Sequence, residues 1–194
     1  MIDTYLQHHI KNILKHKVKL LTSMGVTANQ ITVLGLCLGL GVAFAIINNN
    51  TTLAVILLLL SGYCDILDGI LARAQGGGSF LGTLMDITFD RLVEVSIVLA
   101  LGFTYPNGMP VMMLLLASIV ICITVFLVVG IIIHKESHKS FFYAPGLMER
   151  TEAFILFILL IIFPQWIIII GTIGSLLIFT TGVQRFILTI KYLD

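Results

Sequence analysis

Four aspartates stand in two pairs on either side of a short glycine-rich stretch. Asp65 and Asp68 are three residues apart, and Asp86 and Asp90 are four residues apart. Residues at either spacing share one face of a helix. Two antiparallel helices joined by the turn from Ala74 to Leu81 would bring both faces together and place the carboxylates in one small volume. The pattern indicates a site for a positively charged partner.

A divalent metal ion is the partner that suits these carboxylates. They lie within apolar sequence, where an acidic side chain at membrane depth costs about 2.5–3.5 kcal/mol, and like charges in one place repel each other. Oxygen ligands of this kind suit Mg²⁺ or Mn²⁺, which also bind phosphate oxygens and water. We therefore predict that Asp65, Asp68, Asp86 and Asp90 hold one or two Mg²⁺ or Mn²⁺ ions against a diphosphate.

The elements that carry the aspartates are predicted to be transmembrane helices. Hydrophobic residues make up 58% of the 194 residues and charged residues only 11%, which is far from the composition of a soluble domain. In lipid, an apolar segment of about 20 residues must satisfy its own backbone hydrogen bonds, which favours helices. The predicted fold class is therefore all-α integral membrane. Six transmembrane helices are expected, at Ile31 to Asn48, Leu53 to Arg73, Thr83 to Phe103, Met109 to Ile133, Thr151 to Phe163 and Ile167 to Ile190.

Residues 1–24 are predicted to form an interfacial amphipathic helix before the first span. Their apolar residues recur at helical spacing, and their lysines fall largely on other faces. Such a helix lies at the headgroup level of a membrane, where lysines meet anionic lipid. A solvated helix that binds a partner is the alternative. Residues 25–194 are expected to form one six-helix catalytic domain.

Charged residues are confined to one side of the predicted membrane arrangement. The loops Asn48 to Thr52, Thr104 to Gly108 and Pro164 to Trp166 contain no Lys, Arg, Asp or Glu. All eleven Lys and Arg residues fall on the other side, which the positive-inside rule makes cytoplasmic. We expect both termini and the active site to face the cytoplasm, with the protein in the plasma membrane if the cell is prokaryotic.

Two other classes of function fit part of this pattern. Buried acids mark ion and proton paths in transporters, but such a path needs polar groups through both halves of the membrane. A non-catalytic lipid-binding scaffold would pair its acids with arginines, but Arg73 and Arg91 are the only arginines near the four aspartates and Glu94. Nothing in the chain resembles a nucleic-acid-binding module.

The aspartates belong to a longer string. Residues 65–90 spell D-x-x-D-G-x-x-A-R-(x8)-G-(x3)-D-(x3)-D, which resembles the signature of the CDP-alcohol phosphatidyltransferases. The stretch Thr27 to Thr32 is similar to the P-N-x-(I/V/L)-T segment of that family, with Ala28 in place of the proline. The resemblance implies transfer of a phosphatidyl group from CDP-diacylglycerol to the hydroxyl of a polar alcohol, with release of CMP, in phospholipid biosynthesis. It also implies a homodimer of six-helix protomers with a polar cavity open to the cytosol.

The resemblance further implies roles for single residues. Asp65, Asp68 and Asp86 would be metal ligands. Asp90 would lie at the metal as well and would act as general base. The residues of the CDP-donor site would be Asn29, Asp68, Gly69, Ala72, Arg73 and Gly82. Their chemistry agrees with this, because a guanidinium binds phosphate and glycine allows close approach of a ligand.

Cations on the same side of the membrane are candidates for binding the acceptor alcohol, with ordinary headgroup contact as the alternative explanation. The candidates are Lys135, Arg150 and Arg185. They would suit a phosphorylated polyol such as inositol phosphate or glycerol phosphate. The stretch Gly146 to Glu152 resembles G-x-x-E-R-P-E-R of the phosphatidylinositol-phosphate synthase branch, but Thr151 and Ala153 replace its proline and second arginine. Serine, inositol or a second lipid remain open as acceptors.

Overall fold

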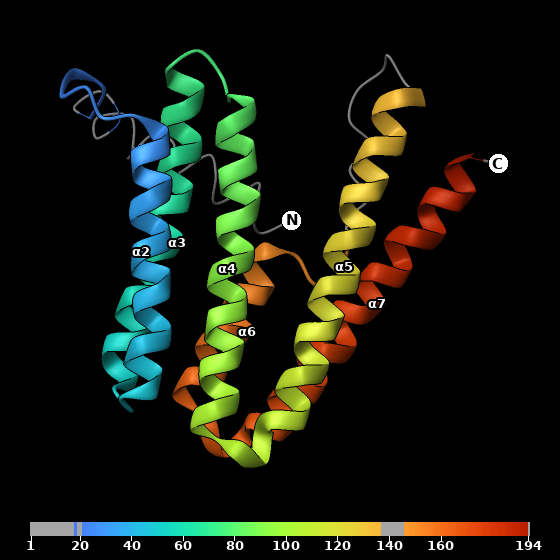
Figure 1. Cartoon of the computed structure of the whole chain (residues 1–194). Coiled ribbons are helices and arrows are strands. Elements are labelled where there is room, and N and C mark those ends of the chain that lie inside the picture. The colour runs from blue at the N-terminus through green and yellow to red at the C-terminus, as the bar shows by residue number, and fades with distance from the viewer. Residues whose placement is uncertain (1–17, 19–20, 137–145, 194) are drawn as a thin grey trace. The chain divides into compact units, whose positions relative to one another are not determined.

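The computed structural model of the chain describes residues 18, 21–136 and 146–193 (Figure 1). In this part all regular structure is helical, which confirms the all-α prediction. The helices are α2 (Ala28–Ile47), α3 (Thr51–Ala74), α4 (Phe80–Thr104), α5 (Met109–Glu136), α6 (Arg150–Ile162) and α7 (Ile167–Leu193), with the short 3-10 helices η1 (Pro106–Gly108) before α5 and η2 (Pro164–Trp166) before α7. The predicted interfacial helix over residues 1–24 falls mostly outside the described residues.

Each predicted span coincides with a helix, but only some of these helices have the length and composition of a membrane span. Among the described residues there are four such segments, at Ala28–Ile47, Thr51–Ala74, Pro106–Ile132 and Pro164–Lys191. Helix α4 is long enough, but it carries Asp86, Asp90, Arg91 and Glu94. Helix α6 has 13 residues and is therefore about 20 Å long, whereas a bilayer core is about 30 Å thick.

The chain divides into two units, Met1–Ala100 and Leu101–Asp194. In the first unit, α2 and α3 pack closely against each other. The hydroxyl of Ser61 donates to the carbonyl of Gly35 at 2.9 Å, and a Cβ atom at Gly35 would stand 3.3 Å from that of Cys64. Helix α4 approaches α2 at Gly39, where any side chain would overlap Val93. Small residues on α2 thus allow three helices to come close together.

A sharp turn joins α3 to α4 and positions the residues that follow. Gly76 and Gly77 have φ angles of 106° and 107°, a region that residues with a Cβ rarely enter. Ser79 then caps the start of α4, because its hydroxyl accepts a hydrogen bond from the backbone N–H of Gly82 at 2.9 Å. The glycine-rich turn predicted from the sequence is therefore present.

In the second unit, α5 and α7 pack along each other and α6 packs on α7. Leu115 of α5 and Leu160 of α6 are fully buried. On α7, Gly174 leaves room for Leu156 of α6, and a Cβ atom at Gly182 would lie 3.3 Å from the Cα atom of Cys122. Close helix contacts in this unit again depend on small residues.

Candidate active site

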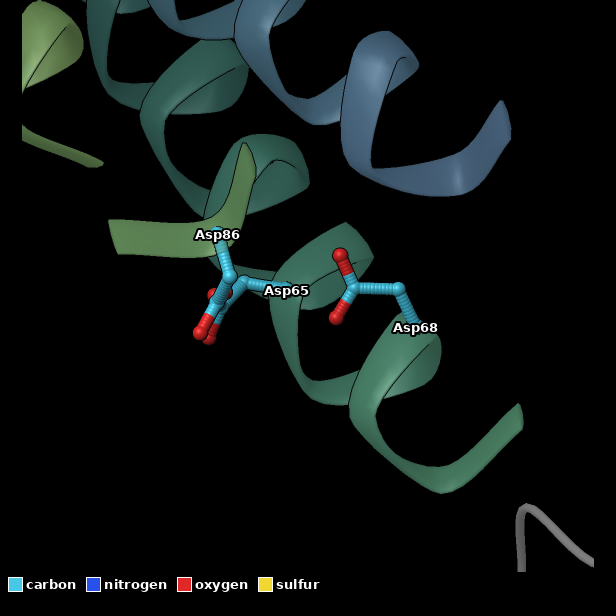
Figure 2. Close-up of side chains that lie close together, drawn as sticks. All are labelled: Asp65, Asp68 and Asp86. Atoms are coloured by element: carbon cyan, nitrogen blue, oxygen red, sulfur yellow. The ribbon is translucent and has the colours of Figure 1, made fainter. Parts of the chain in front are cut away.

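Three of the four aspartates come together in the first unit. Asp65 and Asp68 lie on α3 and Asp86 lies on the early part of α4, and one carboxylate oxygen from each lies within 4.8 Å of the other two. Figure 2 shows the carboxylates of Asp65 and Asp86 next to each other and that of Asp68 turned toward them. The facing sides of α3 and α4 therefore bring these three carboxylates together, as the sequence predicted.

The three carboxylates form a donor set that fits a divalent ion. Asp68 is buried, with 6% of its surface exposed, and Asp65 and Asp86 are half-buried. Mg²⁺ holds oxygen ligands at about 2.1 Å, so ligands on opposite sides of one ion are about 4.2 Å apart. The observed grouping is close to that spacing. It also leaves room for substrate oxygens, because three carboxylates fill only half of an octahedral shell.

Asp90 lies one helical turn after Asp86 on α4 and is half-buried. It is not a member of the group of three carboxylates. Its position on the same face as Asp86 nevertheless keeps it beside the site. The metal-binding role predicted for Asp90 therefore stays a prediction.

Gly69, Ala72 and Arg73, which are predicted for the donor site, follow Asp68 on α3. The guanidinium of Arg73 folds back over Gly69, so that a Cβ atom at Gly69 would be 3.7 Å from one of its terminal nitrogens. Gly69 directly follows Asp68. The cation of Arg73 is therefore held within one turn of a buried carboxylate. Ala72 lies on the same helix and is half-buried.

The other two predicted donor-site residues meet where α2 and α4 begin. A Cβ atom at Gly82 would stand 3.2 Å from the amide oxygen of Asn29 and 3.1 Å from the hydroxyl of Ser79. Glycine at this position therefore allows Asn29, on the first turn of α2, to approach the first turn of α4. All six residues predicted for the donor site belong to the first unit.

Arg91 forms an ion pair within its own helix. Its guanidinium forms an ion pair with Glu94 of the same helix at 2.6 Å.

The acceptor candidates lie in the second unit. The guanidinium of Arg185 on α7 lies 5.0 Å from the centre of the Phe126 ring, and one of its terminal nitrogens lies 3.8 Å from the sulfur of Cys122. Both neighbours belong to α5. Arg150 is exposed at the first residue of α6, and the side chain of Lys135 falls outside the described part of the chain.

The loop before α6 is fixed next to Arg185. The buried hydroxyl of Thr181 accepts a hydrogen bond from the backbone N–H of Met148 at 2.9 Å. A Cβ atom at Gly146 would overlap Thr181 and stand 3.6 Å from Nε of Arg185. The loop that leads to Arg150 therefore packs on α7, one turn before Arg185.

One residue with a place near the site was not predicted. Gln75, the residue after α3, makes one hydrogen bond to Val26, before α2, and one to Ala28, the first residue of α2. It occupies an unspecified position of the signature, and a single glutamine at a helix end gives no signal in the sequence. Only the tertiary structure identifies it.

Comparison with known proteins decides the family. The profile of the CDP-alcohol phosphatidyltransferases matches residues 25–184, which include every predicted site residue except Arg185, the residue that directly follows the matched segment. The chain belongs to this family. As a CDP-alcohol phosphatidyltransferase it transfers a phosphatidyl group from a CDP-linked donor to an alcohol in phospholipid synthesis. Members of this family depend on a divalent metal ion, and the three carboxylates are a fitting donor set for one.

Two relatives illustrate how far the similarity extends. This phosphatidyltransferase is 33% identical over 177 residues to inner membrane protein YnjF of Escherichia coli, covering 86% of this chain and 84% of the relative. It is 29% identical over 144 residues to a phosphatidylinositol phosphate synthase of Corynebacterium glutamicum, covering 74% of this chain and 66% of the relative. The apolar helices and the inner-membrane relative identify an integral membrane protein.

A solved structure shares the fold. The crystal structure of phosphatidylinositol phosphate synthase from Mycobacterium tuberculosis with CDP-DAG bound superposes with a TM-score of 0.73 at 18% identity, covering 92% of this chain and 94% of that one. A second crystal structure of the same synthase, in complex with manganese and citrate, also gives 0.73, over 89% and 86% of the two chains.

Proposed function

We propose that this phosphatidyltransferase takes its phosphatidyl group from CDP-diacylglycerol and transfers it to the hydroxyl of a phosphorylated polyol, with release of CMP. The observation that carries the proposal is the group of carboxylates from Asp65, Asp68 and Asp86, set in the complete family signature with Arg73 beside it. The names of two relatives support the donor and the acceptor class, because one is a phosphatidylinositol phosphate synthase and another synthase has been solved with CDP-DAG.

The donor would be held in the first unit. Asp65, Asp68 and Asp86 would bind Mg²⁺ or Mn²⁺, with Asp90 as a further ligand. When bound, the metal would neutralise the negative charge of the donor diphosphate. Arg73 would add a second cation at the phosphates, while Asn29 would hydrogen-bond the nucleotide beside Gly69, Ala72 and Gly82.

Asp90 would act as the general base. Its carboxylate would accept the proton of the acceptor hydroxyl. The resulting oxygen would attack the phosphorus that carries the lipid, and the bond from that phosphorus to the CMP oxygen would break, so that CMP leaves with the electron pair. The position of Asp90 one turn after Asp86 on α4 supports this role, since a base at the edge of the metal site can reach an acceptor hydroxyl.

Direct displacement is preferred to a covalent enzyme intermediate. The nearest nucleophilic side chains are Ser79 and Cys64. The hydroxyl of Ser79 accepts the N–H of Gly82 at the start of α4, and Cys64 is buried against Gly35 of α2. Both side chains thus have structural roles, and a phosphatidyl adduct trapped without acceptor would contradict direct displacement.

The acceptor would be bound in the second unit. The guanidinium of Arg185 would bind the phosphate of the polyol, held in place by Phe126 and Cys122. Arg150 and Lys135 would add positive charge. A phosphate is favoured over an uncharged alcohol because a bidentate guanidinium contact to phosphate is strong.

The arrangement in the membrane follows from the charges. We propose that α4 and α6 complete a set of six membrane helices, that residues 1–24 lie along the membrane surface, and that the active site and both termini face the cytoplasm. The neutral outer loops support this orientation. A single catalytic domain over residues 25–194 and a homodimer are part of the same proposal.

An assay of CMP release tests the proposed function. Purified protein would be incubated with CDP-diacylglycerol, Mg²⁺ or Mn²⁺ and, in separate reactions, inositol phosphate, glycerol phosphate, inositol and serine. We expect CMP and a new lipid, identified by mass spectrometry, with a phosphorylated polyol. Turnover with an uncharged alcohol alone would reject the acceptor class, and no CMP with any acceptor, under conditions where a related enzyme works, would reject the transfer itself.

A further inference from the structure

Gln75 connects the end of α3 to the segment that leads into α2. Its side-chain amide nitrogen donates to the carbonyl of Val26 at 2.8 Å. Its amide oxygen accepts from the backbone N–H of Ala28 at 3.3 Å. The two hydrogen bonds join residues that are 49 and 47 positions apart. One side chain therefore holds the backbone on both sides of Thr27.

Thr27 is the N-cap residue of α2. Its hydroxyl accepts the N–H of Gln30, and the side chain of Gln30 accepts the N–H of Thr27, at 3.4 and 3.0 Å. This reciprocal capping box fixes the first turn of α2 internally. It does not attach that turn to any other helix. Apolar packing attaches the turn to α3, because Val26, Ala28 and Ile31 share one cluster with Leu67 and Leu71. The two hydrogen bonds of Gln75 add a polar attachment at the same place.

The attached turn carries Asn29. Its amide oxygen lies so close to Gly82 that a Cβ atom there would be 3.2 Å away. Asn29 directly follows Ala28, one of the two partners of Gln75. Asn29 therefore shares the first turn of α2 with a backbone group that Gln75 holds directly.

The residue type at position 28 explains why this contact is useful. Ala28 is the first residue of α2, where proline is favoured because its φ angle is fixed and no N–H is needed. Alanine leaves φ free and leaves an N–H that requires an acceptor. The amide of Gln75 satisfies that N–H and restrains the turn. Thr27 has φ −93° and ψ 153°, a conformation compatible with a following proline.

We propose that Gln75 is a positioning residue for the CDP donor, which acts by holding Asn29 against the first turn of α4. The inference rests on the proposed function, which places Asn29 at the nucleotide. Gln75 itself need not touch the substrate. Its hydrogen bonds replace the restraint that a proline at position 28 would provide.

Steady-state kinetics of Gln75→Leu test the proposal. We expect the KM for CDP-diacylglycerol to rise about five- to tenfold, in line with the loss of two exposed hydrogen bonds, while kcat and the KM of the acceptor change less than twofold. Gln165→Leu is the matched control, because Gln165 is an exposed glutamine in η2 of the second unit. It should leave all three constants unchanged.

Ala28→Pro provides the decisive second variant. Proline at position 28 removes the N–H and fixes φ, so it should restore the donor KM of Gln75→Leu to within about twofold of the wild-type value. A general loss of stability in Gln75→Leu would not be repaired in this way. An unchanged donor KM in Gln75→Leu, or no restoration by Ala28→Pro, would overturn the proposal.

Binding of CDP in the presence of Mn²⁺, measured by calorimetry, separates this inference from the proposed function. If the wild-type protein releases no CMP, the proposed function fails, yet the affinity for CDP can still be compared among the variants. Weaker CDP binding in Gln75→Leu, restored by Ala28→Pro, would support the positioning role without turnover. Equal CDP affinity in all variants would reject it.

Discussion

The two units of the molecule build their polar sites in different ways. In the first unit the charged side chains come from one hairpin, and Asp65, Asp68 and Asp86 lie within 22 residues of sequence. In the second unit Arg185 meets Cys122, which is 63 residues away, and lies beside the loop that begins at Gly146. A site on one hairpin is set mainly by helix periodicity, whereas a site assembled from three segments depends on packing.

The two units also differ in the charge of the side chains that they present. The first unit groups acids, which suit a metal and through it the diphosphate of a donor. The second unit presents the cation of Arg185 against an aromatic ring and a sulfur, which suits an anion. The comparison leads us to expect that substitutions in the first unit change donor and metal binding, and that those in the second unit change acceptor binding.

The largest expected effect is that of Asp68→Asn. Loss of the charge on the most buried of the three carboxylates should reduce kcat/KM by more than about 1,000-fold, because several kcal/mol of metal-dependent stabilisation would be lost. Binding of Mn²⁺, followed by electron paramagnetic resonance, should weaken in parallel. Arg185→Ala is the contrasting variant and should leave Mn²⁺ binding unchanged. Normal Mn²⁺ affinity in Asp68→Asn would break the assignment of metal to the first unit.

Asp90→Asn should separate catalysis from donor binding within the first unit. An amide cannot accept the acceptor proton, so kcat should fall about 10²- to 10⁴-fold. The affinity for CDP, measured by calorimetry with Mn²⁺, should change less than threefold, because the three grouped carboxylates remain. Full activity would remove Asp90 from the role of base, and a loss of CDP binding equal to that of Asp68→Asn would make it a metal ligand only.

Arg73→Ala and Arg185→Ala form a matched pair across the two units. Each removes one guanidinium, and each should raise a single KM about 10- to 100-fold, the effect of losing a charge-assisted hydrogen bond. For Arg73→Ala it should be the KM of CDP-diacylglycerol, and for Arg185→Ala that of the phosphorylated acceptor. Initial rates with one substrate varied at a time give the answer. An equal effect of both variants on both substrates would contradict the division of roles.

Thr181→Val should have a smaller effect that is confined to the second unit. The partly buried N–H of Met148 would lose its acceptor, at a cost of about 1 kcal/mol. The melting temperature in detergent should fall, and the KM of the acceptor should rise several-fold as the loop before Arg150 loosens. The donor KM serves as the internal control and should stay constant. A change in donor KM alone would show that the loop serves the first unit instead.

Gly82→Ala should produce the smallest change among these variants. The added methyl group would press on Asn29 and Ser79 at 3.2 and 3.1 Å, so that the neighbours must move by a few tenths of an ångström. We expect a two- to fivefold rise in the KM of CDP-diacylglycerol with kcat nearly unchanged. Gly130→Ala on α5, where no atom lies within 4 Å of an added Cβ, is the matched control. Equal kinetics in both variants would show that the closeness of Asn29 does not matter.

The first unit was largely predictable because its pattern is local. The spacings within the two aspartate pairs correctly placed Asp65, Asp68 and Asp86 on facing sides of α3 and α4, since the period of a helix fixes the direction of side chains. The separate position of Asp90 was not predictable, because both spacings were compatible with a group of four. Four of the six predicted spans have the length and composition of membrane helices among the described residues. The charges of α4 and the length of α6 set these two helices apart.

The sequence by itself determined the all-α membrane class, the family and the chemistry of the metal site, because composition, helical period and a complete signature act within short stretches of chain. Only the tertiary structure decided which three aspartates come together, what holds Arg185, and that Gln75 joins α3 to the start of α2. These features depend on contacts between residues tens of positions apart, and such contacts are selected by packing in three dimensions. Position 28 illustrates the difference. The sequence shows that alanine stands there and not proline, but only the structure shows that Gln75, 47 residues away, accepts the N–H of this alanine.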